Sequence, residues 1–473
     1  MHLPFAALVV ISTWLQAAPV VAPPATPTTP TAVPTTLPPV TRPLESASRD
    51  SGIHVLHLAD AETLALANQP SMRQARAQTV AAGGRTIQVR SAFFPQLTGI
   101  ASYQHLYNTS STYARGGAGG ATGTGGLTPT PTGTSSTMDY FSVGGTASQL
   151  IWDFGQTYNR YRAANEAESS YEASEKTAEY NVVANVRRAY FSARAQKDLV
   201  DVARDALENQ QRHLVQIQGF VVAGTRTEID LAQTLTDVAN ARVTLINAQN
   251  AYDVARAQLV QAIGRGTAST NFDVASDEIP PVDGEDLPTE KLVARAIEAR
   301  PELVALERQR QSLHLTTKSL SDNYWPSLAA SASGAYAGTS LDSLNPAWSV
   351  GATLTWPFFQ GGLTKGQVRE AEANEDAARA NIDTEKLQVR FDVEQAQLSL
   401  RAAKIVKDAA EETLKNARAQ LRLAEGRYTA GVGTVIELGD AQITFTNASA
   451  QVVQAKFQLS SARVNLLVAM GRQ

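Results

Sequence analysis

The chain has 473 residues, of which 43% are apolar and 18% are charged, and its formal net charge is −4. This composition indicates a folded protein with a sizeable buried surface. Because there is no basic excess and no cluster of Lys and Arg among aromatics, nucleic acid is not expected as a partner. The sequence contains no cysteine, which leaves no residue for disulfides, thiolate metal sites, a cysteine nucleophile or a lipid anchor attached through cysteine.

The N-terminal residues read as a leader and a spacer. An apolar run that begins at Leu3 is followed by small residues near Ala18 and Ala22, where a signal peptidase could cut, so residues 1–22 are predicted to be a signal peptide. The alternative is a buried N-terminal helix, because no Lys or Arg precedes the run. Residues 23–50 are rich in Pro and Thr and are predicted to be a disordered linker.

The rest of the chain contains the same unit twice. Residues 152–264 match residues 359–471 at a constant offset of 207, and an earlier segment, in which Pro95 matches Pro326, has an offset of 231. The first unit therefore carries 24 additional residues, which fall on the Gly-rich stretch 110–136. The predicted divisions are a first repeat at 51–264, a linker or equatorial segment at 265–290, and a second repeat at 291–473.

Each repeat is predicted to run helix, strand, loop, strand, very long helix, turn, helix. Ala-rich segments without Pro cover 157–219 and 364–426, about 60 residues or roughly 90 Å of helix each. Apolar residues recur every seven positions on both sides of the turn, which is typical of coiled-coil packing. The heptad positions are Val200, Leu207, Leu214, Val221, Leu231, Val238, Leu245, Tyr252 and Leu259, then Leu414, Leu421, Tyr428, Leu438, Phe445, Val452, Leu459 and Leu466.

The predicted strands have the alternation of a membrane β-barrel. In "AWSVGATLTWP", Trp348, Val350 and Leu354 share one face, and Ser, Thr and Gly occupy the other. No stretch after the leader has the roughly 18 to 20 continuous apolar residues of a membrane-spanning helix. A soluble sheet with one buried face is the alternative. Four strands per chain cannot close a barrel, since about eight is the smallest number known, so a barrel requires an oligomer. The aromatics predicted to lie at the membrane interface are Trp152, Trp325, Trp356 and Phe359.

The turns between the long helices are "VAGTRTEIDLAQ" (222–233) and "TAGVGTVIELGDAQ" (429–442). Their first glycines, Gly224 and Gly431, suit the positive φ at which a helix ends, and Thr227 and Thr434 can cap the returning helices. Two acids, Glu437 and Asp440, follow the second turn. They either stabilise the start of a helix or, in an oligomer, gather around a shared axis. Asp230 is the counterpart of Glu437 and lies within reach of Arg226 for a local ion pair.

No arrangement of residues points to catalysis. The six histidines form no pattern with Ser and Asp that suggests a nucleophile. The Gly-rich stretch lacks the Lys-Ser/Thr of a phosphate-binding loop, and "WDFG" at 152–155 stands without other kinase elements. His54 and His57 could share a metal, but the pair lacks the further ligands that a metal centre needs. We expect no enzyme, no cofactor and no metal.

From Leu58 to Gly471 the chain resembles the TolC-like outer-membrane efflux channel family. The motifs that carry this resemblance are "LADAETLALANQPSMRQAR" and its repeat "LVARAIEARPELVALERQR", the strand-to-helix junctions "LIWDFGQTYNR" and "PFFQGGLTKGQ", and the tip "RYTAGVGTVIELGDAQ". The resemblance implies a mainly α protein with membrane β. Its homotrimer would form a twelve-stranded β-barrel, four strands per chain, in the lipids of the outer membrane, continuing as an α-helical coiled-coil barrel through the periplasm.

The resemblance also implies the function of a passive gated duct in a tripartite efflux or type I secretion system. An inner-membrane pump of the RND, ABC or MFS type would deliver substrates, and a periplasmic adaptor would dock at the hairpin tips. The alternative is a periplasmic coiled-coil structural or adaptor protein without a membrane barrel. The residues implied to contact the adaptor are Gly224, Thr225, Gly431, Val432 and Gly433.

The family's gate supplies expectations for single residues. Tyr428 matches a tyrosine and Asp230 an aspartate that bond across two tips, and Glu437 with Asp440 matches a pair of acids at the tunnel entrance. The family's arginine is not matched, because Gly433 occupies its place. Arg226 instead stands at the pseudo-symmetric position on the other hairpin, so Tyr428 and Arg226 are the candidates for gate bonding. No function is assigned to the acidic segment 273–288.

Overall fold

The computed structural model describes residues 54–110, 134–264, 272–277 and 279–472, all of which belong to one unit that starts at Ile53. The predicted signal peptide, the Pro/Thr-rich linker and most of the Gly-rich stretch lie outside the described residues. Within them the long apolar helix that could cross a membrane is not found.

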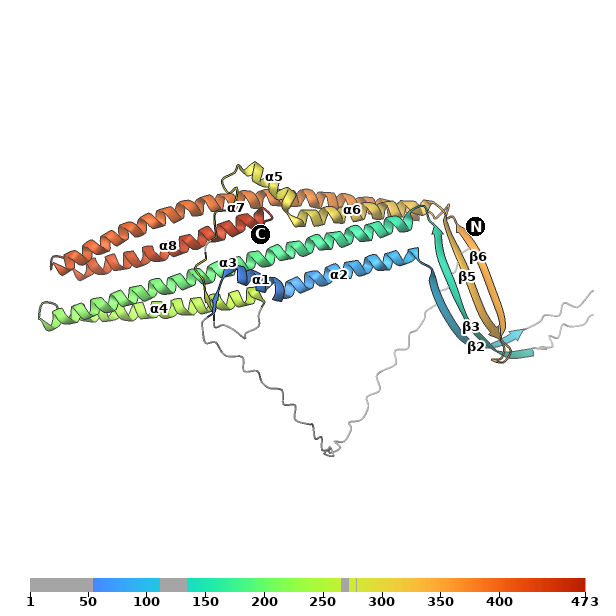
Figure 1. The fold of residues 1–473 in the computed structure, drawn as a ribbon, viewed down its shortest axis with the longest axis horizontal. Helices are drawn as coiled ribbons and strands as arrows, with labels where there is room; N and C mark the ends of the chain where they lie inside the picture. The colour runs from blue at the N-terminus through green and yellow to red at the C-terminus, as the bar shows by residue number, and fades with distance from the viewer. Residues whose placement is uncertain (1–53, 111–133, 265–271, 278, 473) are drawn as a thin grey trace, which may run out of the picture. The chain divides into compact units, whose positions relative to one another are not determined.

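The first repeat follows the predicted order of elements (Figure 1). A short strand leads into two helices, a pair of strands and a helical hairpin. Pro70 opens the second helix at a position where its missing N–H is not needed. The elements are β1 His54–Leu56, α1 Leu58–Asn68, α2 Pro70–Arg90, the 3₁₀ turn Ser91–Phe93, β2 Gln96–Ser110, β3 Thr134–Trp152, α3 Gln156–Val222 and α4 Glu228–Ile263.

The second repeat reproduces the first almost residue for residue. The bounds of α1 and α2 recur 231 residues later in α5 and α6, and those of α3 recur 207 residues later in α7, which confirms the predicted duplication. Helix α5 begins at Thr289, inside the segment 265–290 that was predicted to be a linker. The elements are β4 Phe272–Val274, α5 Thr289–Ala299, α6 Pro301–Ser321, the 3₁₀ turn Asp322–Tyr324, β5 Ser327–Gly338, β6 Asn345–Thr355, α7 Leu363–Thr429 and α8 Val435–Ala469.

Strands β2, β3, β5 and β6 form one antiparallel sheet in the order β2-β3-β5-β6. The registers bring most of the large apolar residues to one face, while Ile100 and Leu150 lie on the other. A β-bulge between Leu150 and Trp152 changes the alternation, so that Trp152 lies opposite Leu328 on this face. The apolar face carries Leu97, Tyr103, Val143, Trp152, Leu328, Tyr336, Trp348, Val350 and Leu354, and the opposite face carries Thr98, Ser142, Thr146, Ser331, Ser333, Ser349 and Thr353.

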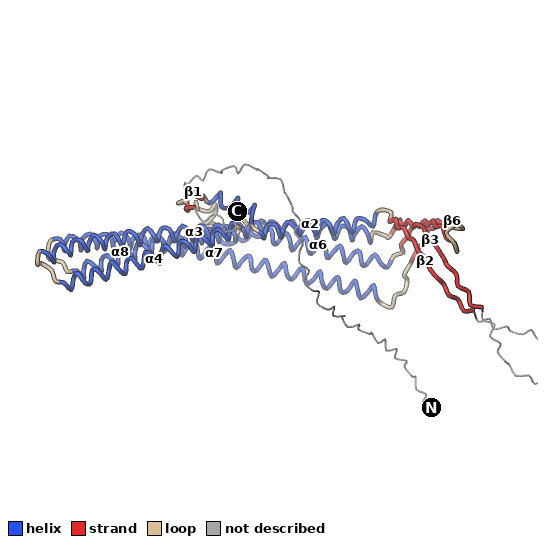
Figure 2. Tube along the Cα trace, turned by 90° about the horizontal axis from the view of Figure 1, so that it is seen from below, coloured by secondary structure: helices blue, strands red, loops and turns tan. Residues whose placement is uncertain are grey.

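The long helices form two hairpins, α3 with α4 and α7 with α8. Helices α3 and α7 have 67 residues each, which corresponds to about 100 Å. The hairpins run side by side, and α3 contacts α8 as well as α4 (Figures 1 and 2). Helix α2 packs on α3, and α6 packs on both α3 and α7. Side chains from these helices make the core, which consists of separate apolar clusters spaced along the hairpins.

The acidic segment between the repeats is tied to both of them by ion pairs. In its first half, Asp273 accepts a bond from Lys197 at 2.8 Å, and Asp277 accepts one from the backbone N–H of Leu58, which starts α1. In its second half, Glu285 pairs with Lys404 of α7 at 2.7 Å. The acidity of this segment therefore has a structural explanation, because its carboxylates join the segment to helices of each repeat.

Glu285 is the buried member of this set, with its side chain 8% exposed, and it also accepts a bond from the N–H of Val282 at 3.1 Å. We expect Glu285→Ala to lower the free energy of unfolding by about 2–4 kcal/mol, because Lys404 and that N–H lose their buried partner. Denaturant unfolding followed by circular dichroism in detergent measures this change.

Asp286 is a matched control, since it pairs with the same Lys404 at 3.1 Å but its side chain is 89% exposed. Asp286→Ala should cost no more than about 0.5 kcal/mol. Equal effects of the two substitutions would contradict the assignment of Glu285 as the anchor.

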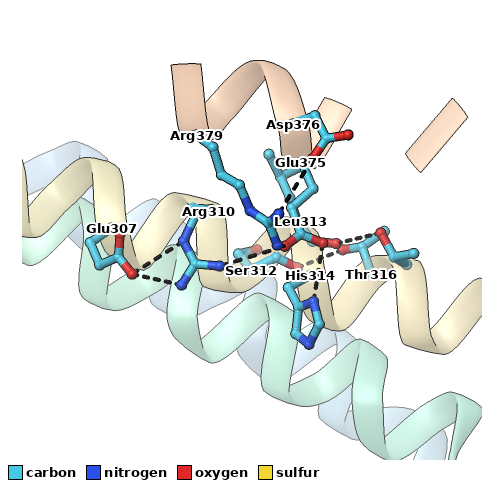
Figure 3. A network of polar contacts seen from close by, with 10 residues as sticks. Glu307, Arg310, Ser312, Leu313, His314, Thr316, Glu375, Asp376 and Arg379 are labelled. Carbon is cyan, nitrogen blue, oxygen red and sulfur yellow. Dashed lines mark hydrogen bonds and ion pairs between the residues drawn. The ribbon is translucent and has the colours of Figure 1, made fainter. Parts of the chain in front are cut away.

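A second buried carboxylate, Glu375, lies between α6 and α7 in the network of Figure 3. Its side chain is 8% exposed, and its oxygens accept from Arg379 at 2.6 Å and from His314 Nδ1 at 3.1 Å. Arg310, which is itself held by Glu307 at 2.6 Å, lies 3.5 Å away. Burial opposes ionisation, but the bonds from His314 and Arg379 outweigh it and keep the pKa of Glu375 below its ordinary value.

Because its pKa is lowered in the fold, Glu375 contributes stability that is present above about pH 4.5 and is lost as the pH falls through the lower folded value. We expect Glu375→Gln to be less stable than the wild type at pH 7, and this difference should shrink below about pH 4.5. Thermal unfolding at several pH values measures it. The neighbouring Asp376, 75% exposed, is the control: Asp376→Asn should follow the wild type, and a pH-independent Glu375→Gln defect would refute the linkage.

Candidate functional site at the hairpin tips

Each hairpin tip is a short turn set by a glycine and a threonine. After α3, Gly224 adopts φ +73°, and after α7, Gly431 adopts φ +76°, conformations that favour glycine. Thr434 then accepts a bond from the N–H of Glu437 at 3.1 Å, and Thr227 forms a capping box with Asp230. These contacts fix where α4 and α8 start, so the turn residues have defined positions.

Gly433 has a steric role that differs from that of the other two glycines. A Cβ at this position would lie 2.9 Å from the backbone nitrogen of Tyr428 and 3.0 Å from the carbonyl carbon of Arg427. The N–H of Gly433 also donates to the carbonyl of Arg427 at 2.9 Å. A side chain at 433 would require the backbone at Arg427 and Tyr428 to shift, so the observed turn has no room for an arginine there.

The structure brings the two gate candidates together. Tyr428 is 3% exposed and projects from α7 onto the first hairpin, where the guanidinium of Arg226 lies 5.1 Å from its ring centroid. The ring also meets those of His213, at 5.4 Å, and Phe220, at 6.2 Å, both edge to face. Burial raises the pKa of Tyr428, and the nearby Arg226 guanidinium opposes that rise. The ring of Tyr428 therefore joins the second hairpin to the first.

The tip acids are arranged differently from one another. Glu437 of α8 pairs with Arg427 of α7 at 3.1 Å, with side chains 42% and 57% exposed, so this pair stays within the second hairpin. Asp440 is exposed one turn further along α8. Asp230 closes the cap of Thr227 at 3.4 Å and makes no ion pair with Arg226 among the contacts of the described residues. The local pair expected between Arg226 and Asp230 is thus absent, because the guanidinium turns to Tyr428 instead.

Three residues of this site were missed by the sequence analysis: Arg427, His213 and Phe220. Arg427 could have been noticed, since it lies in the last turn of α7, ten residues before Glu437. His213 and Phe220 stand four and three residues from the buried Ile217 near the end of α3; His213 is buried, whereas Phe220 is 38% exposed. That periodicity was a usable signal, but it does not identify the partner on another helix.

The predicted interface aromatics lie where the strands join the helices, and each is exposed: Trp152, Trp325, Trp356 and Phe359 are 56–84% accessible. Phe154, with φ +54°, stacks on Trp325 at 5.4 Å. The indole N–H of Trp356 donates to the carbonyl of Tyr324 at 3.2 Å. With these contacts made, the apolar rings still face outward from the chain.

Within the described residues, no three His, Asp or Glu side chains are grouped so as to hold an ion. His57, one of the two histidines considered for a metal, instead lies 3.3 Å from a carboxylate oxygen of Asp277.

A duplicated unit, with one open four-stranded sheet and two long hairpins joined at their tips, defines the class of outer-membrane channel subunits. Comparison with known proteins agrees with this class. The family model described as outer membrane efflux protein matches residues 63–265 and 292–472. The chain belongs to the outer membrane efflux protein family.

The sequence identity to individual relatives is low. The chain is 24% identical to the solvent efflux pump outer membrane protein SrpC of Pseudomonas putida over 72% of its own length and 73% of that protein. It is 26% identical to the outer membrane protein TolC of Escherichia coli, over 66% and 64%. The crystal structure of the Campylobacter jejuni CmeC outer membrane channel superposes with a TM-score of 0.74 at 18% identity, covering 88% of this chain and 85% of that one. The fold is thus shared with solved channels, and the TolC-like resemblance is confirmed.

The contacts of Tyr428 predict which substitutions weaken the joint between the hairpin tips most. Tyr428→Ala should lower the free energy of opening at the tips by about 3–5 kcal/mol, because a buried aromatic side chain is removed. Arg226→Ala should lower it by only about 1 kcal/mol, the value of one cation–π contact. Hydrogen exchange of the turn amides measures both effects.

Leu423, on the same part of α7 but 67% exposed, provides the control, and Leu423→Ala should change exchange by less than about 0.5 kcal/mol. If Tyr428→Ala exchanged no faster than Leu423→Ala, Tyr428 would not be what joins the hairpins.

Proposed function

We propose that the chain is the outer-membrane channel subunit of a tripartite efflux or type I secretion system. Three copies form a passive duct with a twelve-stranded β-barrel in the outer membrane and a coiled-coil helical barrel in the periplasm. An inner-membrane pump delivers the substrate, and a periplasmic adaptor joins the pump to the hairpin tips. Membership of the outer membrane efflux protein family supports this role.

The observation that carries the proposal is the open sheet. Among the described strands, β2 and β6 each have one unpaired edge, and unpaired edges are normally protected or closed. The apolar face is exposed, with Leu97 at 78% and Trp348 at 81%, whereas the opposite face carries mainly small and polar residues. Closure of three such sheets satisfies the edges and gives an apolar exterior around a polar lumen, as a membrane barrel requires.

The tips supply the gate and the docking surface in this proposal. The contact of Tyr428 with Arg226 holds the two hairpins of each copy together. Opening separates them when adaptor and pump bind. Glu437 and Asp440 line the entrance, and the turn residues contact the adaptor. These turn residues are Gly224, Thr225, Gly431 and Val432, which are exposed, and Gly433, which is half-buried.

A periplasmic coiled-coil adaptor without a barrel is disfavoured by the same sheet. Such a protein has no use for four strands that expose Trp348, Val350 and Leu354 on one face. It would remain soluble without detergent. The proposed channel should instead fractionate with outer membranes, where the interface aromatics Trp152, Trp325, Trp356 and Phe359 contact the lipid headgroups.

The proposal is tested by measuring the conductance of the purified protein in planar lipid bilayers. We expect ion conductance with a preference for cations, and Glu437→Ala/Asp440→Ala should reduce that preference because it removes negative charge at the entrance. Asp283→Ala/Asp286→Ala removes equal charge from side chains that are 89% exposed on the segment between the repeats and serves as the control.

A protein that never conducts would refute the duct. Equal effects of the two double substitutions would refute the placement of Glu437 and Asp440 at the entrance. Conductance unchanged by Arg226→Ala would show that the gate does not depend on that cation.

A further inference from the structure

His213 is a buried histidine at the tip contact whose chemistry the proposed gate does not use. The residue is 7% exposed, and its Nδ1 atom has no hydrogen-bond partner. A polar group so placed is costly unless it is neutral or bonded. Its counterpart in the second repeat is Gln420, which cannot titrate, so this feature belongs to the first hairpin only.

The position of His213 links its protonation to the separation of the hairpins. Its ring projects from α3 and meets the ring of Tyr428 on α7 at 5.4 Å and 67°. Around this contact, Ile217, Leu438 and Ala441 form an apolar cluster that draws on both hairpins. Moving α7 and α8 away from α3 would expose the imidazole to water.

The charged groups near His213 act in opposite directions. Burial lowers the pKa of His213, and the cation of Arg226, in the turn between α3 and α4, lowers it further. The amide of Gln216 on α3 and the carboxylate of Asp237 on α4 oppose this shift without overcoming it. Helix α7 presents Tyr428, which is uncharged.

Helix α8 supplies no counter-charge to the imidazole. Its buried residues nearest the contact are Leu438 and Ala441, and the amide of Gln442 is bound by Gln210 at 3.1 Å. The acid at the start of α8, Glu437, is engaged by Arg427. A proton on His213 would therefore lie beside the Arg226 cation without a direct anionic partner.

We propose that His213 makes the tip contact acid-sensitive, so that protonation of its imidazole favours separation of the two hairpins and opening of the duct. That a duct opens rests on the proposed function. That the tips separate rests only on the contact between His213 and Tyr428. The sign follows from linkage. In the separated state the imidazole is solvated and titrates near its ordinary value of about 6.5, whereas in the closed state it resists the proton.

The closed state is therefore favoured above about pH 6.5 and loses ground below it. For each His213 that gains a proton, the ratio of open to closed rises by at most about tenfold per pH unit, until the closed state also takes up the proton. Since the outer membrane passes small ions, a tip in the periplasm would respond to acid outside the cell.

The experiment compares open probability in planar bilayers at pH 7.5 and pH 5.5. The wild type should open more at pH 5.5, and His213→Gln should show no such rise. His213→Phe is the second variant, which keeps a ring against Tyr428 if Gln disturbs the packing. His314→Gln is the matched control, since His314 also contacts partners on α7 but lies in the Glu375 network, and it should keep the rise. A rise that persists in both His213 variants, or a wild type without one, would overturn the inference.

A second readout separates this inference from the duct itself. The chain has no cysteine, so spin labels can be placed on Thr225→Cys/Val432→Cys, one on each tip, and their distance measured in detergent. We expect it to lengthen on acidification, and His213→Gln to abolish the change. Lengthening without conductance in any variant would refute the proposed duct and support the inference. Conductance with tips that do not move on acidification would leave the duct and overturn the inference.

Discussion

The structure depends on one stripe of buried, mostly apolar residues along α7, the seam of this helix. A helix of 67 residues gains little from its own hydrogen bonds, because isolated helices in water are marginal, and it is held by packing along its length. A seven-residue spacing keeps the packed residues on one stripe. Most of them are alanines, which allow the neighbouring helices to approach closely. The buried residues at this spacing are Ile382, Val389, Ala396, Ala403, Ala410, Ala417 and Ala424.

Two residues with polar groups lie at the ends of this apolar seam. One heptad before Ile382, on the side of the sheet, the position is taken by Glu375, a buried carboxylate that needs two arginines and a histidine around it. At the other end, the parallel line through Leu414 and Leu421 finishes with Tyr428. The seam thus holds the middle of the hairpins as a stiff spacer. A change of charge or of solvent exposure should alter helix packing most at the residues at its two ends.

The sequence predicted the elements better than their contacts. The duplication, the four strands and the long helices follow from offsets, from period-two alternation and from the absence of proline. The alanine positions of the seam were not singled out, since alanine favours helix on every face and carries no periodic signal in an Ala-rich segment. The bulge that brings Trp152 to the apolar face was also missed, because its only mark is the register with another strand.

For the candidate site the limit was the same. Pseudo-symmetry pointed to Arg226 and Tyr428, but the expected partner of Arg226 was Asp230, four residues away in sequence. A local ion pair at an exposed turn is worth only about 0.3–0.5 kcal/mol, and the ring of Tyr428 offers the guanidinium a partly dry surface from another helix. The acidic segment between the repeats was unexplained for a related reason, since its partner Lys404 lies more than a hundred residues further along the chain.

The two tips show why a duplicated unit has to diverge if its copies are to be joined. Identical turns packed side by side would present the same groups to each other, two cations or two rings. Here Tyr428 replaces the Val221 of the first copy and enters the other hairpin as a ring, while the cation comes from Arg226. The cation cannot come from position 433 of the second hairpin, because this turn leaves no room even for a Cβ beside the backbone of Tyr428. Because that turn has no room for a side chain at Gly433, the cation beside the buried ring of Tyr428 comes from Arg226 of the first hairpin.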